Sequence, residues 1–138
     1  MNHRYRVLAV DDEPGVRRIV ERVLRGHRCD VVSVADPDSA YQMLGEHSFD
    51  LILLDLRLPG ISGDAFFLAI IRQWPRLLGR VILMSGDPLP PQGDWPIELA
   101  GCPVLHKPFS LDTLVTTVSR VLADLEPDSD IREGNGNP

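Results

Sequence analysis

Short apolar runs alternate with helical patterns along most of the chain, and this alternation constrains the fold more than any other feature. Segments with helical spacing separate five runs that have the length and content of buried strands: Tyr5–Val10, Cys29–Val34, Leu51–Leu54, Arg80–Met84 and Val104–His106. Strands that alternate with helices form a parallel sheet covered by helices on both faces. We therefore predict an α/β domain built on a doubly wound, five-stranded parallel sheet.

Helix boundaries are marked by proline, glycine and capping residues. A first helix is expected between Pro14 and Gly26, with one apolar face made by Val16, Ile19, Val20, Val23 and Leu24. Asp36 followed by Pro37 predicts the start of a second helix, and a third is expected over Gly63–Trp74. Ser110 is expected to cap a last helix, whose inner face would hold Leu111, Leu114, Val115, Val118, Val121 and Leu122.

The segment between the fourth and fifth predicted strands is rich in proline. Four prolines fall where a further helix would be expected: Pro88, Pro90, Pro91 and Pro96. Each interior proline costs a helix about 3 kcal/mol, because it removes a hydrogen-bond donor and collides with the preceding turn. We therefore predict that the fourth helix is missing or very short, with one helical turn over Ile97–Ala100 at most.

Composition and charge limit the classes of function. The 138 residues are 43% hydrophobic and 25% charged, as in an ordinary globular domain, so we expect one domain over 1–125 and a disordered acidic tail over 126–138. A net charge of −6 argues against nucleic-acid binding. No apolar run of 18 residues and no signal peptide occur, which predicts a cytoplasmic protein without membrane insertion. Two cysteines cannot form a zinc site by themselves, so we expect reduced, buried or edge residues.

Polar residues follow the predicted strands at the points where the strands end. Asp11, Asp12 and Glu13 follow the first strand, Asp55 the third, Ser85 the fourth and Lys107 the fifth. The functional crevice of a doubly wound sheet lies at the carboxyl ends of its strands. The sequence therefore predicts that these side chains meet at one edge of the sheet.

These residue types together indicate phosphoryl transfer. Clustered carboxylates repel one another unless a hard divalent cation lies among them, and oxygen ligands suit Mg²⁺. A lysine is a common partner of a phosphoryl group. Asp55 is then the candidate nucleophile, with Lys107 and Mg²⁺ neutralising the phosphoryl oxygens.

Four motifs in this order resemble the receiver domains of two-component response regulators: VDDEPGVRRIV, LILLDLRLPGISG, MSGD and HKPF. The resemblance spans roughly Arg4–Asp124. It implies a flavodoxin-like sheet of strand order 2-1-3-4-5, similar to that of chemotaxis regulators. Because no basic module follows the predicted domain, we expect a stand-alone receiver.

The resemblance also implies a role for each site residue. Asp55 would accept a phosphoryl group from a phosphohistidine of a sensor kinase or phosphotransfer protein, and the result would be changed binding to an unidentified downstream protein. Asp12, Asp55 and the backbone carbonyl of Arg57 would bind Mg²⁺, with Asp11 acting through water. Lys107 would pair with the phosphoryl oxygens, and Ser85 would hydrogen-bond to the phosphoryl group. Such a protein assists only its own phosphorylation and dephosphorylation and is not otherwise an enzyme.

Glu13 has two interpretations: an acid close to the metal site, or an acid favoured near a helix N-terminus. The second is the preferred one.

Three positions depart from the family pattern. Val104 occupies the place of an aromatic residue that often acts as a rotameric switch together with the residue at Ser85, and a valine is too short for that movement. Arg57 and Asp87 occupy the two positions that tune how water reaches the acyl phosphate. We expect these two side chains to pair and to slow hydrolysis.

Three alternatives remain open. A Mg²⁺-dependent aspartyl phosphatase of the haloacid-dehalogenase type also uses an aspartate at a strand end, but it needs a second aspartate where this chain has Arg57. A receiver fragment of a hybrid histidine kinase would share every motif. A phosphorylation-independent interaction module predicts loss of Asp12, Asp55 or Lys107, and all three are present.

Overall fold

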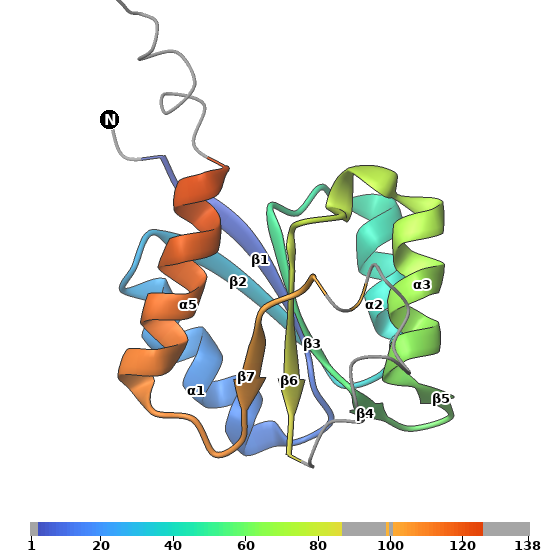
Figure 1. The fold of residues 1–138 in the computed structure, drawn as a ribbon, viewed down its shortest axis with the longest axis horizontal. Helices are drawn as coiled ribbons and strands as arrows, with labels where there is room; N and C mark the ends of the chain where they lie inside the picture. Colours follow the sequence, from blue (N-terminus) through green and yellow to red (C-terminus); the bar gives the residue numbers. More distant parts are fainter. Residues whose placement is uncertain (1–2, 87–98, 100, 126–138) are drawn as a thin grey trace, which may run out of the picture.

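Five parallel strands form a single sheet in the order β2-β1-β3-β6-β7 (Figure 1). The computed structural model describes residues 3–86, 99 and 101–125. The strands are β1 (Tyr5–Val10), β2 (Cys29–Val34), β3 (Leu51–Asp55), β6 (Val81–Ser85) and β7 (Val104–His106). When the five strands of this sheet are numbered by their order along the chain, their order in the sheet is the predicted 2-1-3-4-5. The predicted fold class is confirmed.

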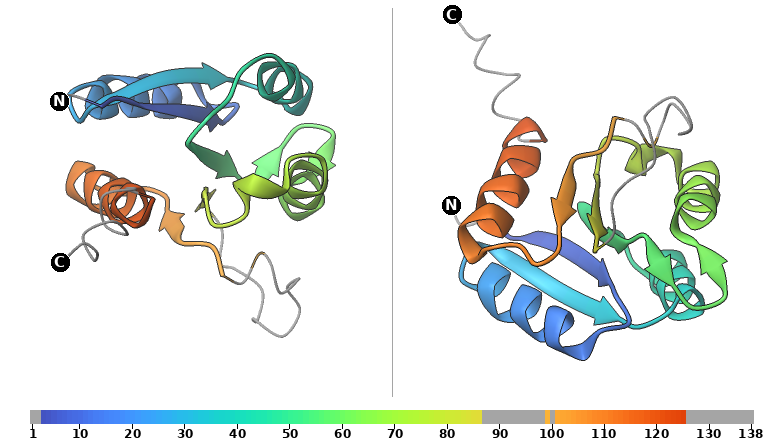
Figure 2. Two further views of the ribbon diagram at one scale, coloured as in Figure 1. Left: turned by 90° about the horizontal axis from the view of Figure 1, so that it is seen from above. Right: turned by 60° about the horizontal axis from the view of Figure 1, so that its bottom comes forward.

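The helices cover both faces of the sheet (Figures 1 and 2). One face carries α1 (Pro14–Arg25) and α5 (Leu111–Asp124), and the other carries α2 (Pro37–Glu46), α3 (Gly63–Gln73) and the short 3-10 helix η1 (Pro75–Leu77). Asp36 and Ser110 cap α2 and α5 with their side chains, as predicted.

Each face of the sheet has its own apolar core because successive side chains of a strand point to opposite faces. In β1, Val7 and Ala9 join the core under α1 and α5, whereas Leu8 and Val10 join the core under α2 and α3. The central strand β3 is buried along its whole length. Met84, Phe66 and Phe67 are also buried, and Met43 packs at the edge of a core, so these side chains have a structural role. His106 is exposed on β7.

Two apolar residues predicted to be inward-facing are exposed instead. Ile19 of α1 is 46% exposed and Leu111 of α5 is 54% exposed. Both lie in the part of their helix nearest the carboxyl edge of the sheet, and both line an apolar groove of about 410 Å³ between α1 and the β7–α5 connection. Apolar spacing therefore identified the inner faces of these helices but not which of their apolar side chains the core covers.

A small hairpin not predicted from the sequence follows β3. It pairs β4 (Arg57–Leu58) with β5 (Ile61–Ser62) in antiparallel fashion around a Pro59-Gly60 turn. Gly60 has a φ of 83°, a left-handed conformation that favours glycine. The hairpin holds Arg57 beside the end of β3.

Two predictions fall on residues that the structure does not describe. The missing or very short helix over Pro88–Ala100 lies outside the described residues except for Leu99, which is buried in the core under α2 and α3. The acidic tail over 126–138, and with it the domain boundary at 125, lies outside them as well.

Among the helices in the described part of the chain, none has the length and apolar content to cross a membrane.

Neither cysteine forms a disulfide, as expected. Burial raises the pKa of the Cys102 thiol to about 11, and burial also raises the pKa of Cys29, which lies in the core under α1 and α5. Thiolate is the nucleophilic form. We expect iodoacetamide at pH 7.5 to modify both thiols much more slowly in the folded chain than in urea, as measured by intact mass. Equal rates in both conditions would contradict this assignment of burial.

Candidate functional site

The predicted site residues meet at the carboxyl edge of the sheet, because the strands that precede them are aligned in register. Val10 pairs with Leu54, Asp55 pairs with Met84, and Ser85 pairs with His106. Asp11 and Asp55 therefore leave the sheet at the same level, and Lys107 follows two residues beyond it. Asp55 and Lys107, together with Asp12, Glu13 and the hairpin, line a cleft of about 580 Å³, and Asp11 is buried beside it.

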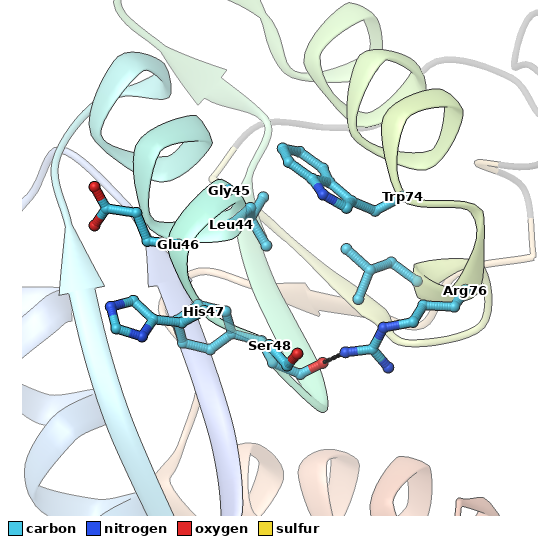
Figure 3. Close-up of a pocket in the computed structure, with 9 residues that line it drawn as sticks. Leu44, Gly45, Glu46, His47, Ser48, Trp74 and Arg76 are labelled. Atoms are coloured by element: carbon cyan, nitrogen blue, oxygen red, sulfur yellow. Dashed lines mark hydrogen bonds between the residues drawn. The ribbon is translucent and has the colours of Figure 1, made fainter.

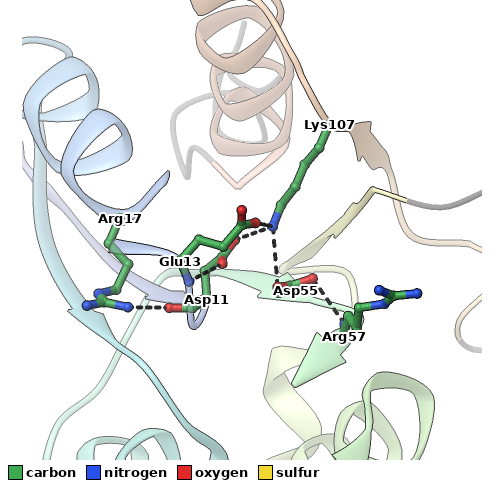
Figure 4. Close-up of polar contacts among 6 residues, drawn as sticks. All are labelled: Asp11, Glu13, Arg17, Asp55, Arg57 and Lys107. Carbon is green, nitrogen blue, oxygen red and sulfur yellow. Dashed lines mark hydrogen bonds and ion pairs between the residues drawn. The ribbon is translucent and has the colours of Figure 1, made fainter. Parts of the chain in front are cut away.

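Lys107 lies at the centre of this cleft and contacts three carboxylates (Figure 4). Its Nζ lies 2.7 Å from Oδ2 of Asp11, 2.7 Å from Oε1 of Glu13 and 3.3 Å from Oδ2 of Asp55. Burial opposes the charged form of this lysine, but the contacts with Asp11 and Glu13 outweigh burial and raise the pKa of Lys107 above its ordinary value. The ammonium is therefore charged at any physiological pH.

Asp11 is fully buried and is fixed from two sides. Its Oδ1 accepts a hydrogen bond of 2.9 Å from the backbone N–H of Glu13, and its carbonyl accepts one of 2.7 Å from Nη1 of Arg17. Its Oδ2 is buried and receives no hydrogen bond from the described residues, although the Lys107 ammonium lies close by as an ion pair. This oxygen therefore has acceptor capacity left for another ligand.

Asp55 ends β3 and is almost completely buried, with 2% of its surface exposed. Its Oδ1 accepts a hydrogen bond of 3.0 Å from the backbone N–H of Arg57. Burial and the nearby charge of Asp11 raise the pKa of Asp55 to about 6, against the opposing effects of the Arg57 N–H and Lys107. One lysine thus compensates only part of the charge in this cleft.

The donor set fits a hard divalent cation. Asp11, Asp12 and Asp55 each offer a carboxylate oxygen, and these oxygens lie within 4.8 Å of one another. Burial and the charge of Asp11 raise the pKa of Asp55, and Asp11 has acceptor capacity to spare, so a bound cation would be favourable here. Mg²⁺ is a cation of the expected charge and ligand preference.

Ser85 and Val104 occupy the two neighbouring strand ends. Ser85 is buried at the end of β6, and its carbonyl accepts a hydrogen bond of 2.7 Å from the backbone N–H of Lys107. Val104 pairs with Leu83 and packs against the core under α2 and α3. Its position is that of a core side chain.

Glu13 has a contact that neither interpretation of the sequence named. It lies directly before α1, but its side chain makes no capping hydrogen bond to that helix. Its carboxylate instead pairs with Lys107, and this hydrogen bond lowers the pKa of Glu13 below its ordinary range. No signal in the sequence identifies this contact, because it joins residues 94 positions apart through two flexible side chains.

Arg57 lines the cleft beside Leu58 and Pro59 of the hairpin. The predicted pairing of Arg57 with Asp87 lies outside the described residues, because Asp87 is not among them.

A second cavity lies at the opposite end of the sheet (Figure 3). It has a volume of about 240 Å³ and is formed by the end of α2, the connection from α2 to β3, and η1 with the preceding Trp74. Arg76 closes one side by donating a hydrogen bond of 2.9 Å to the carbonyl of Phe49. The length of β3 separates this cavity from Asp55.

Residues 7–119 match the family described as the response regulator receiver domain. The chain belongs to this family. The match covers every described residue of the acidic cleft, from Asp11 to Lys107.

Two curated relatives of this receiver domain are longer proteins. This chain is 32% identical over 122 residues to PhoB of Escherichia coli, a phosphate regulon transcriptional regulatory protein. The alignment covers 88% of this chain and 53% of PhoB. This chain is 42% identical over 60 residues to MtrA of Mycolicibacterium smegmatis, a DNA-binding response regulator. That alignment covers 44% of this chain and 26% of MtrA. The chain thus spans about half, or less, of the length of these relatives.

Solved structures show the same fold. The chemotaxis response regulator CheY4 of Vibrio cholerae has a TM-score of 0.74 at 28% identity, with 86% of this chain and 98% of that chain covered. The signal receiver domain of a LuxO repressor protein from Vibrio parahaemolyticus has a TM-score of 0.76 at 28% identity, with 96% and 99% covered. The receiver fold therefore extends over almost all of the described chain.

Proposed function

We propose that Asp55 is the phosphoacceptor of this receiver domain and that Lys107 assists the transfer. One observation supports this assignment above the others: the Asp55 carboxylate is buried at the end of the central strand, 3.3 Å from Lys107 and grouped with two further aspartates. Burial excludes most of the competing water, and the strand holds the nucleophile rigidly.

The reaction is a displacement at phosphorus. A carboxylate oxygen of Asp55 forms a bond to phosphorus, the P–N bond of the phosphohistidine breaks, and its electron pair returns to the imidazole nitrogen of the donor. The product is an acyl phosphate on Asp55. Lys107 donates to the phosphoryl oxygens and compensates the charge that they bring.

The acid cluster would hold Mg²⁺ in this scheme. Asp12, Asp55 and the carbonyl of Arg57 are the proposed protein ligands, and Asp11 acts through water. When bound, the ion neutralises phosphoryl oxygens. The buried Asp11 is fixed through its hydrogen bond from Glu13, so its role is to hold a solvent molecule in place rather than to move.

Three further roles complete the proposal. Ser85 hydrogen-bonds to the phosphoryl group after transfer. Arg57 and Asp87 shield the acyl phosphate, so loss of the arginine side chain in Arg57→Ala would shorten its lifetime; an unchanged or longer lifetime would contradict this role. Val104 packs as a core residue, so transmission does not depend on an aromatic side chain at this position.

The donor is a sensor histidine kinase or a histidine phosphotransfer protein, and the output is altered binding to a downstream protein. The donor and the output partner would both meet this domain in the cytoplasm.

Intact mass after incubation with acetyl phosphate and Mg²⁺ tests the proposal. We expect one added phosphoryl group per chain in the presence of Mg²⁺ and none when EDTA replaces Mg²⁺ in the incubation. Release of phosphate from many phosphate esters with multiple turnovers would instead support a phosphatase, and no adduct under any donor condition would contradict the phosphoacceptor role.

Lys107→Met tests the contribution of the ammonium while keeping an unbranched side chain. A hydrogen bond to a charged group contributes about 1.5–3 kcal/mol, so we expect labelling by acetyl phosphate to slow about ten- to hundredfold. Time courses of intact mass at saturating Mg²⁺ measure this rate. A rate within twofold of the wild type would show that Lys107 does not compensate the phosphoryl charge.

A further inference from the structure

The contact between Glu13 and Lys107 has no part in the mechanism described above. The two side chains form a hydrogen bond of 2.7 Å, shorter than the 3.3 Å that joins Lys107 to Asp55. The lysine side chain is 14% exposed and that of Glu13 is 60% exposed. Glu13 therefore covers the ammonium on its solvent side, whereas Asp11 and Asp55 contact it from inside.

The backbone aims Glu13 at this position. Its N–H donates to Asp11 and its carbonyl accepts from the N–H of Arg17 at 3.2 Å, in the first turn of α1. Its side chain makes no capping bond to that helix. Within the described residues, Lys107 is the one hydrogen-bond partner of this carboxylate.

A phosphoryl group on Asp55 would compete for the same ammonium. The acyl phosphate carries about −1.5 to −2 units of charge in place of the single charge of the carboxylate, and it places three strong acceptor oxygens near Lys107. An ammonium has three donors; here it donates hydrogen bonds to Glu13 and Asp55 and forms an ion pair with Asp11. Asp11 is buried and fixed, so the exposed Glu13 is the partner most easily displaced.

We propose that Glu13 is a positioning residue that holds Lys107 in the unphosphorylated receiver and is displaced from it by the phosphoryl group on Asp55. The inference rests on the proposed function, since it assumes phosphorylation of Asp55. Its consequence is that Glu13 slows phosphorylation, because transfer must break a contact that the unphosphorylated chain has already made.

The chain offers well-matched variants for a rate test. Glu13→Gln removes the charge at almost constant size, and Glu13→Asp keeps a negative charge next to α1 but is one methylene too short for the same contact. Glu46→Gln makes the same change at an exposed glutamate of α2, away from the cleft. Exposed ion pairs contribute at most about 1 kcal/mol, so we expect about two- to fivefold faster labelling by acetyl phosphate in Glu13→Gln.

The three variants give distinct outcomes. Faster labelling in both Glu13→Gln and Glu13→Asp, with Glu46→Gln equal to the wild type, supports displacement of a specific contact. Wild-type rates in Glu13→Asp would show that negative charge at the cleft mouth is sufficient and would overturn the inference. So would a wild-type or slower rate in Glu13→Gln. A wild-type chain that takes no phosphoryl group would overturn the proposed function instead.

A second readout follows Lys107 itself, which is the only lysine in the sequence. Labelling with ¹⁵N-lysine therefore gives a single side-chain ammonium signal in NMR spectra. We expect faster proton exchange of this ammonium in Glu13→Gln than in the wild type, and equal exchange in the two proteins once Mg²⁺ and beryllofluoride, a stable substitute for the phosphoryl group, are added. Equal exchange before addition would show that Glu13 does not hold the lysine and would overturn the inference without reference to phosphorylation rates.

Discussion

Asp55→Asn is expected to take up no phosphoryl group from acetyl phosphate under conditions in which the wild-type chain is fully labelled. The amide nitrogen and oxygen of asparagine cannot form a stable acyl phosphate, and the other cleft carboxylates are placed differently. Asp11 is fixed by hydrogen bonds on two sides, and Asp12 is exposed. The measurement is intact mass over a time course, and a labelled Asp55→Asn chain would place the acceptor on another residue.

The same variant should remain folded and become more stable, which separates loss of the nucleophile from loss of structure. Burial raises the pKa of Asp55 from 3.8 to about 6, so the folded state loses stability as the pH rises through this window and the buried carboxyl ionises. Asn has no charge to bury. At pH 7.5 without Mg²⁺ we expect a higher thermal midpoint for Asp55→Asn than for the wild type; a lower midpoint would mean that the charge of Asp55 is compensated more fully than its neighbours indicate.

The strands and the acidic cleft could be predicted from the sequence because the signals are local. A run such as Leu51–Asp55 shows its burial in its composition, and parallel strands then bring their carboxyl ends to one edge. Asp11, Asp55 and Lys107 followed from this topology, without any knowledge of side-chain geometry. The predicted bounds of two strands differ from the observed ones by one residue: Asp55 extends β3, and β6 spans Val81–Ser85 instead of Arg80–Met84.

The features that were missed depend on tertiary placement. The β4–β5 hairpin has two residues in each strand, too few for a periodic pattern. Ile19 and Leu111 have the spacing of an inner face, yet both side chains line the exposed groove instead of the core. The Glu13–Lys107 contact depends on the directions of two side chains from distant segments, which no spacing rule describes.

Gly63→Ala should be the most damaging single methyl group that can be added to the described glycines. Gly63 begins α3, and a Cβ there would lie 2.3 Å from Cα and 2.5 Å from the carbonyl oxygen of Leu56. Both atoms belong to the backbone, so no side-chain rotation can relieve the overlap. Adding volume to a well-packed site costs about 1–3 kcal/mol, and we expect a loss of about 3 kcal/mol in the free energy of unfolding, measured by urea denaturation.

Gly45→Ala is the matched control, because it makes the same change in α2 where no atom lies within 4 Å of the added Cβ. There, alanine should raise the free energy of unfolding by about 0.5–1 kcal/mol through its better helix propensity. Equal effects of the two substitutions would contradict the close approach of Gly63 to Leu56.

The clash in Gly63→Ala should also reach the cleft, because Leu56 lies between Asp55 and Arg57 in the chain. The carbonyl of Leu56 accepts a hydrogen bond of 3.0 Å from the N–H of Gly63, and the N–H of Leu56 donates one of 2.9 Å to the carbonyl of Met84. A displaced Leu56 moves the N–H of Arg57 that fixes Asp55, so we expect Gly63→Ala to slow phosphoryl labelling even at temperatures where the variant is fully folded.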